Sequence, residues 1–480
     1  MIALSLTEIA GLVGGQPHDI PDPDLKVTGP VVIDSREVRP GSLFAALPGE
    51  RVDGHDFARG AVEAGAVAVL AARPVGTPDA PVPAIVVPDV IAAMGALARA
   101  VVERLGGTTV VALTGSAGKT STKDLIAQLL QRRGPTVWTP GNFNNEIGLP
   151  VAALSADEAT QHLVLEMGAR GKGHIRYLTE LTPPRVGLVL NVGTAHIGEF
   201  GGREQIAEAK GELVEALPPA EEGGVAVLNA DDPLVRAMAS RTKARTVLFG
   251  EAEDADVRAG NVRLADGGRP AFTLHTPTGC SDVTMRLYGE HHVSNALAAA
   301  AVAHELGMSV DEIAVALSEA GQLSRWRMEV TERSDGVTVV NDAYNANPES
   351  MRAALRALVA MGAATPGRRT WAVLGPMAEL GEESLAEHDA VGRLAVRLNV
   401  SKLVAVGGQE AAWLDMGAKN EGSWGEESVH VSDVRAAVDL LRSELRPGDV
   451  VLVKASRSVG LERLAQALLD GEGEVAGRWA

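Results

Sequence analysis

The residues best suited to chemistry form a short segment between a predicted strand and a predicted helix. Thr114-Gly115-Ser116-Ala117-Gly118-Lys119-Thr120 follows the apolar run 110–113 and precedes apolar residues at helical spacing. This order is typical of a phosphate loop, here a shortened one with Leu113 at the usual first glycine. The glycines let backbone amides converge on phosphate oxygens, the helix N-terminus adds positive charge, and Lys119 supplies a cation. We therefore predict nucleotide binding, with Thr120 placed to hold magnesium; an ordinary strand-to-helix turn is the alternative.

Two more polar side chains follow predicted strands. Glu166 comes directly after the apolar run 163–165, and His196 comes shortly after the run 186–190. In open parallel sheets ligands bind at the carboxyl ends of strands, where a carboxylate and an imidazole could complete magnesium coordination around ATP. A capping glutamate and a structural histidine fit the spacing equally well. Lys210, in contrast, has the pattern of a solvated helical lysine.

The elements that must position these residues alternate between apolar runs and helical stretches, which predicts parallel sheets with flanking helices. The central runs are 110–113, 163–165, 186–190 and 225–228, and after Ser324 the rhythm restarts at 337–340, 371–374, 403–406 and 450–453. At roughly 100 to 200 residues per domain, we expect an α/β protein of three domains at 1–100, 101–323 and 324–480. The middle one would be a parallel-sheet ATPase domain and the last one a Rossmann-like doubly wound domain. The proline-rich stretch 73–83 is predicted to be a rigid connector or loop, and 250–256 and 266–270 are predicted to be loops.

Composition excludes several classes of protein. The net charge of −18 would repel nucleic acid and anionic membrane surfaces at long range. No apolar run reaches the ~18 residues of a membrane span, and the N-terminal segment has the pattern of an amphipathic helix rather than a signal peptide. We expect a cytoplasmic monomer with no membrane insertion. Cys280 is the only cysteine, which excludes an intramolecular disulfide, and we expect its thiol to be buried.

Several longer segments resemble the Mur ligase family, and the resemblance covers nearly the whole chain. Besides the phosphate loop, the similar segments are Thr139-Pro140-Gly141-Asn142-Phe143-Asn144-Asn145-Glu146-Ile147-Gly148-Leu149-Pro150, Glu166-Met167-Gly168, Asn191-Val192-Gly193-Thr194-Ala195-His196, 289–299 and Trp326-Arg327-Met328-Glu329. Two positions depart from the family pattern: His292 stands where asparagine is usual, and Trp326 where glycine is usual. The resemblance implies ATP-dependent amide-bond formation through an acyl-phosphate, with Mg²⁺ as cofactor.

The resemblance also implies roles for individual residues. Asn295 would bind the adenine edge, Arg327 would reach the ATP phosphates from the C-terminal domain, and Asp342 and Tyr344 would lie against the nucleotide. Lys210 matches the lysine that family members carbamylate, which would make it a carboxylate-like ligand for a second magnesium. The implied catalytic set is Lys119, Glu166, His196, Lys210 and Arg327, and the implied metal ligands are Thr120, Glu166, His196 and Lys210.

Two signatures in the C-terminal third narrow the expected substrates. Segments 342–351 and 374–381 are similar to those of family members that add D-alanyl-D-alanine to UDP-N-acetylmuramoyl-tripeptide in peptidoglycan biosynthesis. Lys454 and Ser456 follow the predicted strand 450–453, where a cation and a hydroxyl could dock the dipeptide carboxylate. A helix N-cap is an equally good use of Ser456.

The other substrate would lie nearer the N-terminus. Ser35 and Arg36 resemble part of the family's UDP-sugar domain, and Asn142, Asn144 and Asn145 belong to a segment similar to its substrate-facing loop. The resemblance therefore places the UDP-muramoyl peptide across the first two domains.

Two alternatives stay open at this point. One is another Mur-type or folylpolyglutamate-type amide ligase, which the Asn144-Asn145 loop and segment 344–351 disfavour. The other is a non-catalytic nucleotide-binding protein on the same fold, since fold alone does not establish activity. The joint presence of Glu166, His196 and Lys210 disfavours such a protein, because a binder would not need a full metal-binding set.

Overall fold

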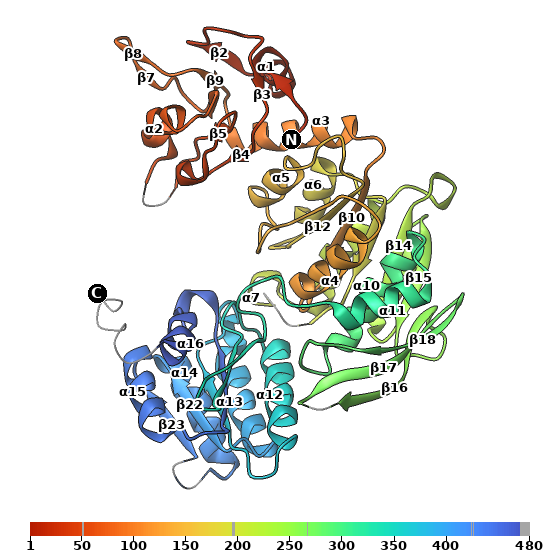
Figure 1. Cartoon of the computed structure of the whole chain (residues 1–480), viewed down its shortest axis with the longest axis vertical. Helices are drawn as coiled ribbons and strands as arrows, with labels where there is room; N and C mark the ends of the chain where they lie inside the picture. Colours follow the sequence, from red (N-terminus) through yellow and green to blue (C-terminus); the bar gives the residue numbers. More distant parts are fainter. Residues whose placement is uncertain (50–51, 194–196, 266, 424, 426, 471–480) are drawn as a thin grey trace.

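The structure is a computed structural model that describes residues 1–49, 52–193, 197–265, 267–423, 425 and 427–470. Three α/β bodies follow one another along the chain, at the top, right and lower left of Figure 1. Among the described residues, no helix is both long enough and apolar enough to cross a membrane. The three-domain α/β class predicted from the sequence is confirmed.

The N-terminal body is built on a five-stranded sheet in the order β2-β9-β6-β5-β4. The strands are β2 (Gln16–His18), β4 (Val31–Val32), β5 (Leu43–Ala45), β6 (Ala68–Ala71) and β9 (Ala84–Val86), with β1 (Leu4–Ser5) and β3 (Lys26–Val27) pairing separately. Helices α1 (Leu6–Val13) and α2 (Ala58–Glu63) flank them. The stretch 73–83, predicted to be a connector or loop, includes a short hairpin, β7 (Gly76–Thr77) and β8 (Ala80–Pro81), before β9 rejoins the sheet.

A long helix joins this body to the next one. Helix α3 (Val90–Arg104) begins at Asp89, whose side chain accepts hydrogen bonds from the N–H groups of Ile91 and Ala92. Its apolar face packs against α1 on one side and against α5 (Gly148–Ala153) and α6 (His174–Leu181) on the other. Because α3 runs across position 100, the predicted boundary there falls inside a helix; the domain limits stay predictions.

The central body contains a nine-stranded sheet in the order β11-β12-β10-β13-β14-β15-β16-β17-β18. Its parallel part comprises β10 (Thr109–Thr114), β11 (Thr136–Trp138), β12 (His162–Glu166), β13 (Val186–Val189), β14 (Val225–Asn229), β15 (Arg245–Gly250) and β16 (Val257–Ala265). Strands β17 (Arg269–Thr276) and β18 (Gly279–Thr284) continue it antiparallel. Cys280 lies on the edge strand β18 and is exposed, so the expectation of a buried thiol is wrong.

Alternate residues of β10 show why this sheet is apolar throughout. Val110 and Ala112 pack with residues of α3, α5, α6 and α8 (Arg203–Glu215), whereas Val111 and Leu113 pack with α4 (Lys119–Gln131), α10 (His292–Glu305) and α11 (Val310–Glu319). A parallel strand covered on both faces reads as a continuous apolar run. Short helices α7 (Ile197–Phe200) and α9 (Pro233–Arg236) complete this body.

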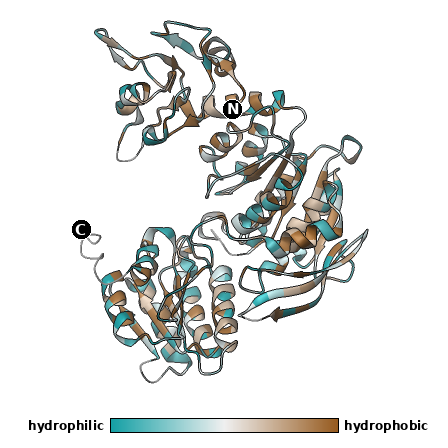
Figure 2. Cartoon of the chain, viewed as in Figure 1, coloured by the Kyte–Doolittle hydropathy of each residue, from teal (hydrophilic) through white to brown (hydrophobic). Residues whose placement is uncertain are grey.

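The C-terminal body is the doubly wound sheet predicted from the sequence, in the order β19-β20-β24-β21-β22-β23. Its strands are β19 (Glu329–Glu332), β20 (Thr338–Asn341), β21 (Thr370–Leu374), β22 (Lys402–Val406), β23 (Ser428–Val431) and β24 (Val450–Lys454), parallel except for β19. Helices α12 (Pro348–Ala363), α13 (Ser384–Arg397) and α14 (Gln409–Glu421) cover one face, and α15 (Val434–Glu444) and α16 (Glu462–Leu469) cover the other. Figure 2 shows the apolar strands enclosed by helices of mixed hydropathy.

Candidate active site

A cavity of about 440 Å³ lies between the central and C-terminal bodies. Its central wall includes the phosphate loop, the end of β12 and Lys210, and its C-terminal wall includes Arg327, Tyr344 and the start of α12. In open parallel sheets, ligands bind outside the carboxyl ends of the strands, which is where both sheets meet this space. The cavity thus gathers residues that are far apart in the sequence.

The phosphate loop has the geometry that the sequence predicted for it. Strand β10 ends at Thr114, and α4 begins at Lys119 with no side chain capping its first N–H groups. Gly118 has φ +80°, and a Cβ there would lie 2.5 Å from Oδ1 of Asn295, so this position requires glycine. Nζ of Lys119 donates a hydrogen bond to the carbonyl of Gly115 at 2.8 Å. These open N–H groups and the lysine make an anion-binding helix end.

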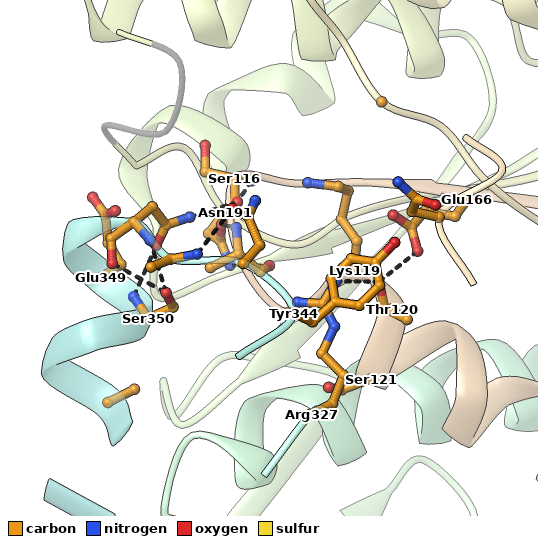
Figure 3. A pocket seen from close by; sticks show the side chains of 18 of the residues that line it. Ser116, Lys119, Thr120, Ser121, Glu166, Asn191, Arg327, Tyr344, Glu349 and Ser350 are labelled. Carbon is orange, nitrogen blue, oxygen red and sulfur yellow. Dashed lines mark hydrogen bonds between the residues drawn. The ribbon is translucent and has the colours of Figure 1, made fainter. Parts of the chain in front are cut away.

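Asn191 holds the phosphate loop in place, a role that we did not predict from the sequence. Its Oδ1 accepts hydrogen bonds from the N–H groups of Ser116 (3.0 Å) and Ala117 (2.9 Å), and its Nδ2 donates to the carbonyl of Ala117 (3.1 Å). Ser116 Oγ in turn accepts from the N–H of Gly193. Figure 3 shows Asn191 beside Ser116. The signal was available: Asn191 follows a strand that neighbours β10 in the sheet.

Glu166 is the centre of a hydrogen-bonded group at the end of β12. Its Oε2 accepts from Oγ1 of Thr120 at 2.9 Å, and its Oε1 accepts from Nδ2 of Asn144 at 2.7 Å. Arg327, from the C-terminal body, donates through Nη2 to the same Thr120 hydroxyl at 3.2 Å. Glu166 is 1% exposed. The structure therefore brings together residues that the sequence assigned separately to the nucleotide, the metal and the substrate (Figure 3).

Two lysines of the central body face this group. Lys210 on α8 is 5% exposed, so the pattern of a solvated helical lysine was misleading. Burial lowers its pKa far below the usual lysine value, and the positive charge of Lys119 lowers it further. The pKa of Lys119 is also lowered, chiefly by burial, although the nearby Glu166 carboxylate opposes the shift. His196 lies outside the described residues.

The four residues predicted to contact the nucleotide outside the phosphate loop all line the cavity: Asn295, Arg327, Asp342 and Tyr344. Oδ1 of Asn295 accepts a hydrogen bond from Oγ1 of Thr122 at 3.2 Å, which orients its amide beside the phosphate loop. The guanidinium of Arg327 lies 4.1 Å from the centre of the Tyr344 ring, a cation–π contact. The rings of His291 and His292 are tilted against each other with centres 4.3 Å apart. Burial lowers the pKa of His291 to about 4 and lowers that of His292 well below its usual value, so both histidines are neutral near pH 7.

The residues predicted to bind the dipeptide behave differently from one another. Lys454 lines the cavity, and its Nζ donates to Oδ2 of Asp342 at 2.6 Å and to the carbonyl of Asn345 at 3.0 Å. Ser456 does not line it: its Oγ accepts from the N–H of Ala378 and donates to the carbonyl of Ala346. The hydroxyl makes no helix-capping bond either, so it joins two loops instead.

Only some of the residues predicted to bind the UDP-muramoyl peptide line the cavity. Asn142, Asn144 and Asn145 line it, and Oδ1 of Asn145 also accepts the N–H of Gly148 at the start of α5. Ser35 and Arg36 belong to the N-terminal body and do not line it. The exposed Arg36 is bound to Asp34, and this contact lowers the pKa of the Asp34 carboxyl to about 2.

Family models match three stretches of the chain. The Mur ligase middle domain matches residues 113–303, the glutamate ligase domain of Mur ligases matches 326–457, and the Mur ligase family catalytic domain matches 30–101. These matches fall one in each of the three bodies.

Similar proteins extend over almost the full length. The UDP-N-acetylmuramoyl-tripeptide–D-alanyl-D-alanine ligase of Mycobacterium tuberculosis is 51% identical, covering 98% of both chains, and that of Escherichia coli is 36% identical, covering 98% of this chain and 99% of its own. A crystal structure of MurF from Acinetobacter baumannii has a TM-score of 0.85 at 33% identity, covering 98% of this chain and 99% of its own. MurF ligase from Thermotoga maritima in complex with ADP has a TM-score of 0.77 at 32% identity, covering 92% and 97%. With this fold, this cavity and these relatives, the chain belongs to the Mur ligase family.

Proposed function

We propose that this protein joins D-alanyl-D-alanine to UDP-N-acetylmuramoyl-tripeptide at the expense of ATP, giving UDP-N-acetylmuramoyl-pentapeptide, ADP and phosphate in peptidoglycan biosynthesis. The observation that carries the proposal is the contact between Arg327, Thr120 and Glu166, which joins a phosphate loop to a second domain within one cavity. Relatives that share 51% of its residues are named for this reaction.

The first step activates the tripeptide. A carboxylate is a poor electrophile, so its oxygen attacks the γ-phosphorus of ATP, the bond to the bridging oxygen of ADP breaks, and an acyl-phosphate results. Catalysis of phosphoryl transfer relies on positioning and on charge stabilisation. Lys119 and Arg327 supply cations there. Nε of Arg327 is buried and has no hydrogen-bond partner among the described residues, which suits an arriving anionic oxygen.

The oxygen donors near the phosphate loop suit magnesium. The Thr120 hydroxyl and the Glu166 carboxylate are hard ligands, and they already lie within hydrogen-bond distance of each other. Bound Mg²⁺ would neutralise charge on the phosphates. His196 and Lys210 are the further proposed ligands. Because burial lowers the pKa of Lys210, a larger fraction of its amine is neutral. A neutral amine can add CO₂ and release a proton to solvent, which gives a carbamate.

The second step forms the amide. The free amine of the dipeptide attacks the acyl carbon, the resulting tetrahedral intermediate breaks its bond to the phosphate oxygen, and the amine proton passes to a base that the described residues do not single out. Exclusion of water protects the acyl-phosphate, and we propose that closure of the C-terminal body provides it. Small-angle scattering that showed no compaction with nucleotide and tripeptide would contradict closure.

The substrates would approach from opposite ends. We place the UDP-sugar on the N-terminal body near Ser35 and Arg36, with the peptide passing Asn142, Asn144 and Asn145 toward the cavity. The dipeptide carboxylate would meet Lys454 in competition with Asp342, since these two residues are already paired. A monomer in the cytoplasm is the proposed working form.

One assay tests the proposal against its alternatives. Phosphate release is measured with UDP-N-acetylmuramoyl-tripeptide and, in turn, D-alanyl-D-alanine, D-glutamate, L-lysine and meso-diaminopimelate. We expect release with the dipeptide. Release that does not prefer the dipeptide would indicate another amide ligase, and no release with any acceptor would indicate a nucleotide-binding protein without this activity.

A further inference from the structure

A buried pair of opposite charges lies on α4, the helix that follows the phosphate loop (called the phosphate helix below), just outside the cavity. Lys123 is completely buried and Asp124 is 6% exposed. Nζ of Lys123 lies 3.0 Å from Oδ1 of Asp124. Neither residue lines the cavity, and no step proposed above uses either of them. Because transferring two charges out of water is costly, a buried pair of this kind contributes little net stability compared with apolar side chains of similar size. We therefore look for the role of this pair in the hydrogen bonds that the two side chains make with neighbouring segments.

Lys123 holds the loop that carries the substrate-facing asparagines. Its Nζ donates a hydrogen bond to the carbonyl of Thr139 at 2.8 Å, immediately after strand β11. Lys123 comes three residues after Thr120, so both side chains leave the same face of α4. The helix that presents the phosphate-loop hydroxyl thus also fixes the first residue of the loop leading to Asn144.

Thr139 transmits this position to Glu166. Oγ1 of Thr139 accepts a hydrogen bond from the N–H of Glu166 at 3.0 Å, and the N–H of Thr139 donates to the carbonyl of Val164 at 3.0 Å. Thr139 is completely buried, so both bonds are shielded from water. From Lys123 to the Glu166 backbone there are therefore two buried hydrogen bonds in series. The Glu166 carboxylate is then held by Thr120 and Asn144, which start from the same helix and the same loop.

Asp124 makes the corresponding contact with a different segment, the one that precedes Arg327. Its Oδ2 accepts a hydrogen bond from the N–H of Ser324 at 3.1 Å. One turn later, the side chain of Gln128 bonds both the N–H and the carbonyl of Gly321. These contacts fix the segment that leads directly to Arg327, whose guanidinium returns to Thr120.

We propose that Lys123 and Asp124 are positioning residues for phosphoryl transfer, Lys123 setting the place of Glu166 through Thr139 and Asp124 setting the place of Arg327 through Ser324. This inference rests on the proposed function for its catalytic meaning. The positioning itself does not depend on the reaction: the pair holds the Glu166 carboxylate and Arg327 at a fixed distance from the phosphate helix.

The test compares ADP binding with and without Mg²⁺ in the full-length protein, measured by calorimetry, together with turnover. In Lys123→Met, the gain in ADP affinity from Mg²⁺ should fall about tenfold, because residues that orient a metal ligand typically contribute 10–100-fold. ADP binding without Mg²⁺ should change less than about twofold, since the phosphate-loop backbone keeps its own contacts. Turnover should fall by a similar 10–100-fold, with little change in KM for the dipeptide.

A second pair of variants keeps the test valid if Lys123→Met does not fold because it leaves Asp124 unpaired. The double variant Lys123→Met with Asp124→Asn has no buried charge, and the Asn oxygen can still accept the N–H of Ser324. The double variant should recover thermal stability, but Mg²⁺ should still increase its ADP affinity about tenfold less than in the wild-type protein. Thr139→Val removes the acceptor for the Glu166 N–H and should repeat the defect, whereas Thr139→Ser should retain wild-type behaviour.

Lys402→Met is the matched control, since Lys402 on strand β22 of the C-terminal body is also a buried lysine, paired with Glu444 at the end of helix α15. It should lower the melting temperature without changing the Mg²⁺ gain. If Lys123→Met loses stability alone, or loses ADP binding equally with and without Mg²⁺, the positioning role is wrong. If the wild-type protein releases no phosphate with any acceptor but Lys123→Met still loses the Mg²⁺ gain, the proposed function fails while the positioning role stands.

Discussion

Lys210 in the central body and Lys454 in the C-terminal body are almost completely buried at the same cavity, but their surroundings treat the two amines differently. Lys454 is paired with Asp342, whose charge opposes the lowering of its pKa by burial. For Lys210, burial and the positive charge of Lys119 both lower the pKa. In the C-terminal wall of the cavity, the charge of Lys454 is therefore neutralised by the Asp342 carboxylate. At the central wall, no such opposing charge raises the pKa of Lys210 among the described residues, and this is the amine for which we propose carbamylation.

Lys119→Ala would break this contrast most severely, because it removes a cation that faces the phosphates. Turnover should fall by at least about 10³-fold, the upper range for losing one preorganised charge-stabilising group. The measurement is phosphate release at saturating tripeptide and dipeptide, with circular dichroism as the check on folding. Full activity in this variant would refute the role assigned to the loop.

Lys210→Ala sharpens the contrast by testing whether Lys210 supplies a carboxylate at this cavity after its amine has taken up CO₂. We expect turnover to fall about 10²- to 10³-fold, and added short carboxylic acids such as acetate or propionate should restore part of it. Lys454→Ala serves as the comparison, and it should show no such rescue. Rescue of both variants, or of neither, would remove the distinction between the two lysines.

Lys454→Met tests the ion pair between Lys454 and Asp342. The change leaves Asp342 buried without its cation, and the loss of one partner from a buried pair costs about 3 kcal/mol of unfolding free energy. Adding Asp342→Asn should recover part of that loss, because no uncompensated charge remains. Urea denaturation followed by fluorescence gives both values. A loss below about 0.5 kcal/mol, typical of exposed positions, would show that the pair does not behave as a buried one.

The smallest expected effect is on the pH dependence of stability. The folded-state pKa of Lys210 lies below its unfolded-state value, so between those two pKa values the unfolded chain binds more protons. Stability must therefore rise with pH through that window and level off above the unfolded-state pKa. Relative to Lys210→Met, the wild-type protein should gain at most about 1.4 kcal/mol per pH unit there. Denaturation at several pH values in CO₂-free buffer measures the slope; an equal slope in both proteins would contradict the shift.

The parallel strands were predictable because their signal is local. Val110 to Leu113 are apolar on both faces, and the observed strand extends the run by one residue at each end. The antiparallel extension was missed, because β16 and β17 alternate buried and exposed residues only weakly around glycine-rich turns. Segment 266–270, predicted to be a loop, overlaps the start of β17.

The site was predictable only in part, for a related reason. Glu166 could be recognised because it ends a strand. The burial of Lys210 depends on packing between elements that are distant in the sequence, which the spacing along α8 does not reveal. Lys123 was not singled out from the sequence, although its position three residues after Thr120 on the predicted helix was the available signal. Contacts across the domain boundary, such as that of Arg327, came from family resemblance and not from residue patterns.

The single thiol of the chain offers a practical consequence. Cys280 is exposed on an outer strand of the central sheet, and it does not line the cavity. One fluorophore can therefore be attached there with no background from other cysteines. A second cysteine introduced on an exposed surface of the C-terminal body would complete a donor–acceptor pair for energy transfer. The approach of the two bodies could then be followed in real time during turnover, in the intact enzyme.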